Sequence, residues 1–226
     1  MGFNLEHFII TIVVLIVSIS LHEFGHAISA DRLGDPTPRR EGRVTLWPDK
    51  HFDPFGFTAI LVSSFTGYGI GWGKPVMVQP GNFRNPTQGM MIVSICGPVM
   101  NLALAIFFGI IFRILIVTGK VTPDMLYDIA GGSTSNGLMA YQLIYSFVYI
   151  NLALMFFNMI PITPLDGSKI LSGFLPVEYS MKYERFMGQY GILLLAALII
   201  SRSTWLVIGP PVYFSLGVLL GTRFGN

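Results

Sequence analysis

The sequence predicts an all-α integral membrane protein with about five to six transmembrane helices. Of its 226 residues, 52% are hydrophobic and 12% are charged, whereas ordinary globular proteins carry about 25% charged residues. The mean hydropathy is +0.63. A water-soluble fold of this size could not cover its surface with so few charges. The single cysteine, Cys96, excludes a disulfide scaffold, and the net charge of +2 is too small for a nucleic-acid-binding protein.

Long apolar segments define the expected spans, because a helix needs about 20 apolar residues to cross the hydrocarbon core. The first apolar segment lacks the basic residues with which a signal peptide begins, so we interpret it as a retained helix. A helix from about residue 5 is expected to be followed by spans at about 88–112 and 137–160 and by two further apolar segments, 186–201 and 203–222.

Prolines and polar residues separate these spans. The segment 34–53 should be a surface loop, with Arg43–Trp47 a possible short strand. Lys74–Pro80 should be extended, because a proline disfavours helix in the residue before it. Thr118–Asn136 is expected to be a polar loop, and Gly209-Pro-Pro211 should bend or break the last apolar segment.

The segment His22-Glu23-Phe24-Gly25-His26 is an HExxH motif. On a helix its two histidines lie about 40° apart around the axis, so both imidazoles can reach one metal ion. Glu23 lies beside them, in the position of a base that deprotonates a zinc-bound water. The motif begins roughly 20 Å past Phe8 at 1.5 Å per residue, still inside the bilayer. Ionisable residues at that depth indicate a functional site.

A catalytic zinc usually has three protein ligands, so a third must come from elsewhere in the chain. Asp166 is the candidate, because it ends the long uncharged segment 129–165. Pro161 and Pro164 break the preceding helix near the membrane and let the carboxylate turn inward.

Several alternatives accompany this interpretation. The motif could be a buried His–Glu pair that joins two helices, and Asp166 could be the N-cap of a helix beginning at Gly167. Asp31 and Asp35 are fallback ligands. Cysteine or serine catalysis is disfavoured, because Cys96 has no histidine nearby in sequence and the serines of the polar loop near residue 133 have no base.

With both motifs in place, the sequence resembles the site-2 protease family of intramembrane zinc metalloproteases. The family pattern is HExxH in one membrane helix and N-x-x-P-x-x-P-L-D-G in a later one, here at Asn158–Gly167. The resemblance covers roughly residues 15 to 175. Further family-like pieces follow in the family's order at Gly42–Leu46, His51–Gly56, Gly73–Val76, Phe83–Pro86 and Gly97–Asn101.

The resemblance implies roles for individual residues. His22, His26 and Asp166 would ligate one zinc ion per chain, and Glu23 would be the catalytic base. Asn158 would support the tetrahedral intermediate or position the substrate. Substrate contacts are expected at Lys74, Pro75, Val76 and Asn101.

The implied function is hydrolysis of peptide bonds within or near transmembrane segments of membrane-protein substrates. We expect one domain over 1–226, with a catalytic core at about 5–175, C-terminal helices at about 183–222 and no PDZ or CBS domain. The expected partners are a transmembrane protein substrate and the lipid bilayer, not nucleic acid, and the oligomeric state stays open. The alternatives are a membrane zinc transporter, which would need more intramembrane carboxylates, and an inactive scaffold, which would not need Glu23.

The two motifs also predict a topology. The histidines and Asp166 each lie near the C-terminal end of a helix, so an even number of spans must separate them. Two clear spans intervene, so 54–73 should be a re-entrant hairpin after the HExxH helix. Eleven of the 14 Lys and Arg residues then lie on the active-site side, if the last two apolar segments both cross. The positive-inside rule places that side in the cytoplasm and the N-terminus outside.

Overall fold

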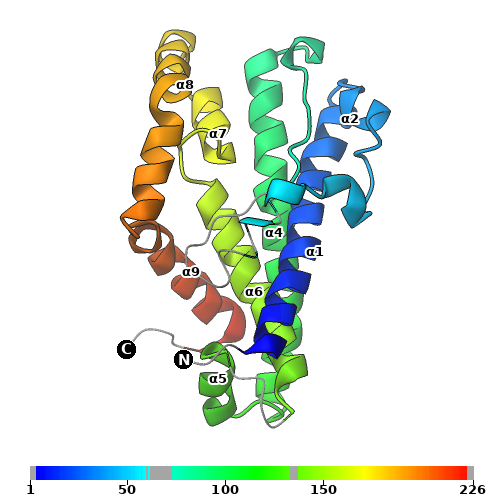
Figure 1. Cartoon of the computed structure of the whole chain (residues 1–226), viewed down its shortest axis with the longest axis vertical. Helices are drawn as coiled ribbons and strands as arrows, with labels where there is room; N and C mark the ends of the chain where they lie inside the picture. Colours follow the sequence, from blue (N-terminus) through cyan, green and yellow to red (C-terminus); the bar gives the residue numbers. More distant parts are fainter. Residues whose placement is uncertain (1–3, 57, 60, 62–72, 133–136, 223–226) are drawn as a thin grey trace.

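The computed structural model describes residues 4–56, 58–59, 61, 73–132 and 137–222. This part of the chain is built from helices and loops and contains no β-strand (Figure 1). Four of its helices are long and apolar enough to cross a membrane, which confirms the predicted all-α membrane fold. The elements are α1 (Leu5–Arg32), α2 (Thr37–Arg40), η1 (Pro48–His51), η2 (Pro80–Asn82), α4 (Pro86–Val117), α5 (Pro123–Ala130), α6 (Met139–Asn158), α7 (Asp166–Phe174), α8 (Val177–Ile200) and α9 (Thr204–Leu220).

Local signals set the starts of the long helices. The side chain of Asn4 accepts a hydrogen bond from the backbone N–H of His7 at 3.1 Å and caps α1. Asn85 caps α4 in the same way, and Pro86 occupies the first helical position, where its missing N–H costs nothing. In a bilayer a helix satisfies its own backbone groups, which favours helix throughout these apolar segments.

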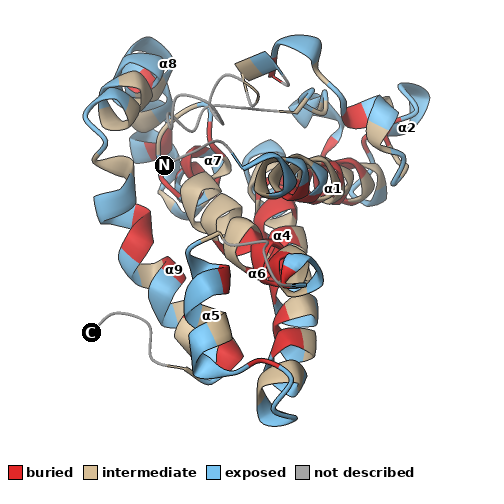
Figure 2. Cartoon of the chain, turned by 60° about the horizontal axis from the view of Figure 1, so that its bottom comes forward, coloured by how far each residue is buried: buried red, intermediate tan, exposed pale blue. Residues whose placement is uncertain are grey.

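The interior lies where α1, α4 and α6 meet. Figure 2 shows buried residues on the facing sides of these helices, whereas α8 is mostly exposed. Helices α1 and α4 touch at a glycine: a Cβ atom on Gly25 would lie 2.7 Å from the carbonyl oxygen of Cys96. Such small residues let membrane helices approach to backbone contact without a hydrophobic driving force.

Helices α8 and α9 follow one another from the α7 end of the molecule to the opposite end. The first begins beside α7, where the hydroxyls of Ser172 and Ser180 are 2.7 Å apart. The second ends beside the end of α4, where Arg113 donates to the carbonyl oxygen of Val218 at 3.2 Å. The two helices thus lead from the α7 end to the far end of α4, and a total of five to six spans is not confirmed.

The prolines of α9 do not break it. The helix continues from Thr204 to Leu220 with Pro210 and Pro211 inside it, so of the predicted bend or break, the break does not occur. The corner between α8 and α9 lies instead at Arg202, whose φ is 57°.

The loops differ from the sequence prediction in two places. Arg43–Trp47 is not a strand, and the described residues offer it no partner strand. Its bonds are those of a folded loop: the N–H of Arg43 donates to the carbonyl oxygen of Pro38 at 2.8 Å, and a ring nitrogen of His51 bonds the carbonyl oxygen of Thr45 at 2.8 Å. The polar loop after α4 contains α5, whose start is capped by Thr122. The predicted hairpin at 54–73 falls largely on residues outside the described part of the chain.

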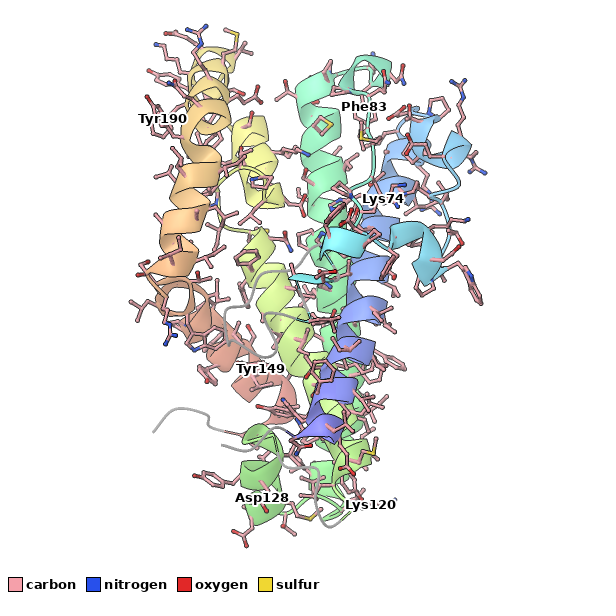
Figure 3. The ribbon with its side chains drawn as sticks, viewed as in Figure 1. Lys74, Phe83, Lys120, Asp128, Tyr149 and Tyr190 are labelled. Atoms are coloured by element: carbon pink, nitrogen blue, oxygen red, sulfur yellow. The ribbon has the colours of Figure 1, made fainter. Side chains whose placement is uncertain are left out.

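Basic residues gather at one end of the molecule. Figure 3 shows Lys74 beside α1 in the upper half of the view and Lys120 and Asp128 at the bottom. Arg113 lies near Lys120, at the end of α4. Ten Lys and Arg residues belong to the elements and loops at the α7 end, namely Arg32, Arg39, Arg40, Arg43, Lys50, Lys74, Arg84, Lys169, Lys182 and Arg185.

This arrangement predicts which positions react from which side. In a Cys96→Ala background, cysteines replacing Lys50 and Lys182 should label with a membrane-impermeant maleimide from one side. Cysteines replacing Lys120 and Tyr127 should label from the other, because α4 and α6 carry the chain across and back. A reporter fused after Asn226 should lie on the Lys120 side; finding it on the Lys50 side would mean that α8 and α9 cross separately.

Candidate metal centre

Two helix segments far apart in sequence bring three ligand atoms together. His22 and His26 lie on one face of α1, and Asp166 is the first residue of α7. The Nε2 atoms of the two histidines are 3.0 Å apart. Asp166 Oδ2 lies 3.2 Å from the first and 3.3 Å from the second. The three residues predicted as ligands therefore converge on one point.

The other ring nitrogens show where the protons lie. His22 Nδ1 is 2.6 Å from Asn101 Oδ1, and His26 Nδ1 is 2.8 Å from the carbonyl oxygen of Val93. Oxygens of this kind accept hydrogen bonds, so each Nδ1 carries the proton and each Nε2 is left with a lone pair. Metal-binding histidines are oriented in this way.

The cluster needs a cation. Among the described residues, no hydrogen-bond donor satisfies the buried Oδ2 of Asp166. Two nitrogen lone pairs and a carboxylate thus face one another without a proton between them, which is unfavourable unless a positive charge lies among them. Tetrahedral zinc with bonds of about 2.0–2.1 Å separates its ligand atoms by about 3.3 Å. The observed separations fit zinc.

Asp166 is not a helix cap. The N-cap of α7 is Leu165 and makes no side-chain cap bond, so the N-cap alternative is wrong. The next residue must be small, because a Cβ atom on Gly167 would lie 2.3 Å from the carbonyl oxygen of Met159. The glycine lets the turn after α6 fold back closely enough to point the carboxylate at α1.

The two fallback ligands serve other bonds. Asp31 pairs with Arg39 through two bonds of 2.7 and 2.8 Å. The fully buried Asp35 accepts hydrogen bonds from Thr37, from the N–H of Gln79 and from the side chain of Asn82. Its burial alone would raise its pKa, but these bonds outweigh burial and hold the pKa below its ordinary value. They therefore persist at neutral pH and anchor the segment that begins near Gly73.

We call residues 73–79 the strap. The strap lies across Glu23: the N–H of Val76 donates to Glu23 Oε2 at 3.1 Å. It is neither helix nor strand, and its last residue, Gln79, is extended with φ −105° and ψ 100°. The N–H of Lys74 donates to the carbonyl oxygen of His51 at 2.9 Å. The predicted substrate residues 74–76 are thus held against the predicted base.

A buried arginine fixes this arrangement. The side chain of Arg43 is 3% exposed and lies 3.9 Å from the Glu23 carboxylate. Its guanidinium donates to the carbonyl oxygens of Lys50 and Lys74, so it joins the loop after α2 to the strap. Sequence reasoning placed Arg43 in a possible strand and missed this role. The available signal was a basic residue within one of the family-like pieces.

Comparison with known proteins identifies the family. The model of peptidase family M50 matches residues 10–198. The chain belongs to family M50, the site-2 protease family. It is 36% identical over 199 residues to "Putative zinc metalloprotease YwhC" of Bacillus subtilis, which covers 88% of this chain and 84% of the relative.

More distant M50 relatives are longer than this chain. Identity to "Putative zinc metalloprotease Rip2" of Mycobacterium tuberculosis is 28%, over 76% of this chain and 59% of the relative. Identity to "Zinc metalloprotease MJ0392" of Methanocaldococcus jannaschii is 25%, over 89% of this chain and 47% of the relative. No solved structure matches this chain.

The two predicted asparagines of the M50 motifs lie in different places. Asn101 is fully buried, with its Oδ1 at 2.6 Å from His22 Nδ1, and its contact with substrate stays a prediction. Asn158 lies at the end of α6, and its amide donates to the carbonyl oxygen of Leu154 at 2.9 Å. The role of Asn158 in the reaction stays a prediction.

A glycine of the M50 motif Gly97–Asn101 makes room for the histidine rings. A Cβ atom on Gly97 would lie 2.4 Å from His26 Cε1 and 2.7 Å from His22 Cε1. Both rings therefore lie directly on the backbone of α4. The motif was noticed in the sequence, but its glycine was not assigned a role, because this contact requires the three-dimensional arrangement of α1 and α4.

Gly97→Ala should therefore displace both imidazoles and weaken metal binding. Loss of correct ligand orientation typically costs 10–100-fold in metal affinity, and we expect a loss of about this size or larger, measured by chelator competition on the purified protein. Gly188→Ala is the matched control, because its Cβ would meet no atom within 4 Å. Equal affinity in the two variants would contradict the assigned contact.

Proposed function

We propose that the chain is an intramembrane zinc metalloprotease that hydrolyses peptide bonds within or near transmembrane segments of membrane proteins. The observation that carries the proposal is the convergence of His22, His26 and Asp166 beside Glu23, on a helix long and apolar enough to span the membrane. Membership of family M50 supports it, as do the names of the Bacillus and Methanocaldococcus relatives.

Each residue of the site has its own role in the proposed reaction. His22, His26 and Asp166 would hold one zinc ion, which when bound supplies Lewis acidity for activating water and polarising the scissile carbonyl. Glu23 accepts the proton of the attacking water and returns it to the leaving amine. The amide of Asn158, with one hydrogen still available, supports the developing oxyanion.

The strap supports a mode of substrate binding. A transmembrane helix hides its carbonyls in its own hydrogen bonds, so the substrate must unwind and be held extended. The carbonyl oxygen of Lys74 accepts from Arg43, and the N–H of Val76 donates to Glu23. The backbone groups of both residues therefore point to the same edge of the strap. In an extended chain, alternate residues point to opposite edges, so Met77 faces the other edge. Among the described residues nothing accepts a hydrogen bond from the N–H of Met77, so a substrate strand can pair there.

The distribution of charge supports an orientation. The ten basic residues at the α7 end compare with Arg113 and Lys120 at the other end and with Arg202 at the corner between α8 and α9. By the positive-inside rule the site opens toward the cytoplasm, and α1 begins on the outer side.

Glu23→Gln tests the proposal most directly. The amide leaves the three ligands in place but cannot accept the water's proton, so zinc should stay bound while cleavage falls by about 10²–10⁴-fold. The measurements are zinc content by mass spectrometry and cleavage of a model transmembrane substrate in detergent or liposomes. Near-normal cleavage by this variant would transfer the base role to another group.

Asp166→Asn tests the third ligand. Asparagine keeps the size of the side chain but removes the anionic charge that faces both Nε2 atoms. The variant should still insert in membranes, bind zinc more weakly and lose most cleavage. His22→Ala, which leaves two ligands, serves as the metal-free reference. Full zinc content and normal cleavage in Asp166→Asn would remove Asp166 from the site.

Met77→Pro tests the free edge of the strap. Proline removes the N–H of Met77 and keeps Val76 extended, so the bond from Val76 to Glu23 survives. Losing one hydrogen bond of about 1 kcal/mol should lower kcat/KM roughly fivefold. Met77→Ala keeps the N–H and is the matched control, since this side chain is 61% exposed. Equal kcat/KM values for the two variants would argue against strand pairing at this edge.

A further inference from the structure

A second polar group lies behind the histidines, where α1, α4 and α6 meet. It consists of Ser18, Asn101 and Asn151, one from each helix, and all three are fully buried. The mechanism above does not use Asn151, and the sequence analysis did not single it out. Buried amides between membrane helices are costly unless every group is paired, so the pairing shows what they do.

Each hydrogen bond of this group has a fixed donor and a fixed acceptor. Asn151 Nδ2 donates to the carbonyl oxygen of Phe147 and to Ser18 Oγ, each at 2.8 Å. A backbone carbonyl cannot donate, so the amide nitrogen must face it and Asn151 Oδ1 must face away. That oxygen accepts from Asn101 Nδ2 at 2.9 Å.

The same reasoning fixes the next two groups. Asn101 Nδ2 also lies 3.3 Å from the carbonyl oxygen of Ser18, so the amide of Asn101 cannot flip without losing both acceptors. Its Oδ1 is therefore the atom that meets His22 Nδ1 at 2.6 Å. An oxygen in this position requires the proton on Nδ1 and leaves the lone pair on Nε2.

We propose that Asn151 is a positioning residue that sets the tautomer of His22 through Asn101 and so prepares Nε2 for the metal. The inference rests on the metal site of the proposed function. Asn151 lies on α6, the helix that leads to Asp166, and His22 lies on α1. The network thus couples the helix before the carboxylate ligand to the orientation of a histidine ligand.

Another polar pair on α6 separates this role from simple helix association. Gln142 Nε2 donates to Ser146 Oγ at 3.3 Å, and both residues are buried. Within the described residues, no hydrogen bond joins this pair to Asn101 or to His22. Ser146→Ala therefore removes a buried polar contact from the same helix without disturbing the network.

The first test measures metal affinity. Asn151→Leu keeps an approximate shape but removes one of the two acceptors that hold the Asn101 amide, so zinc or Co²⁺ affinity by chelator competition should fall about 10–100-fold. Ser146→Ala should bind metal like the wild type. Asn101→Leu should weaken binding at least as much, and the double variant should be no weaker than Asn101→Leu alone, because Asn151 acts through Asn101.

The second test reads the tautomer itself. In metal-free protein labelled with ¹⁵N-histidine, the His22 signal, assigned from its loss in His22→Ala, should show a protonated Nδ1. In Asn151→Leu it should show a mixture of tautomers, whereas Ser146→Ala should keep the wild-type signal. A role in helix packing alone would leave this signal unchanged.

The outcomes separate this inference from the proposed function. A wild-type protein that binds no metal would overturn both. A metal-binding wild type with unchanged affinity and tautomer in folded Asn151→Leu would overturn this inference alone. Where Asn151→Leu does not fold, Ser18→Ala removes one acceptor of the Asn151 amide, and we expect a loss of metal affinity of a few-fold. Unchanged affinity in that variant would also overturn the inference.

Discussion

The close approach of α1 and α4 at two glycines is the constraint on which the site depends. Gly25 brings the backbones into contact, and Gly97 gives the histidine rings a surface without side chains to lie on. Only at this separation can α4 supply the oxygens of Val93 and Asn101 that fix both Nδ1 protons. Helix packing therefore determines which nitrogen atoms face the metal, and a larger residue at either glycine would change chemistry as well as stability.

Two buried charged side chains, Arg43 and Asp35, perform the corresponding task for the base. Arg43 donates to the carbonyl oxygen of Lys50 and, at the start of the strap, to that of Lys74. Asp35 accepts from the N–H of Gln79 at the end of the strap. A segment without helix or sheet partners is thereby held in one place over Glu23. Both charged side chains form hydrogen bonds with backbone groups of the protein itself. Their role is local order, because an extended segment cannot otherwise repay its loss of conformational entropy.

The sequence predicted the features that depend on local pattern. The HExxH spacing, the uncharged segments and the aspartate after two prolines identified the membrane fold and the three residues that converge. It could not show Arg43 or Asn151, because each acts through residues distant along the chain. The strand expected at Arg43–Trp47 failed for the same reason: its propensity was local, whereas the burial of Arg43 and the bond from His51 to Thr45 come from the tertiary fold.

The single passage of α8 and α9 bears on the orientation of the whole molecule. The sequence argument counted eleven basic residues on the site's side by letting both segments cross. Without that assumption, ten basic residues still lie at the α7 end. They belong to α1, to the segments between α1 and α4, to α7 and to the first half of α8. At the far end, the guanidinium of Arg113 donates to the carbonyl oxygen of Val218 in α9. The asymmetry that supports a cytoplasmic site therefore comes from the loops that build the site, and not from the path of the last two helices.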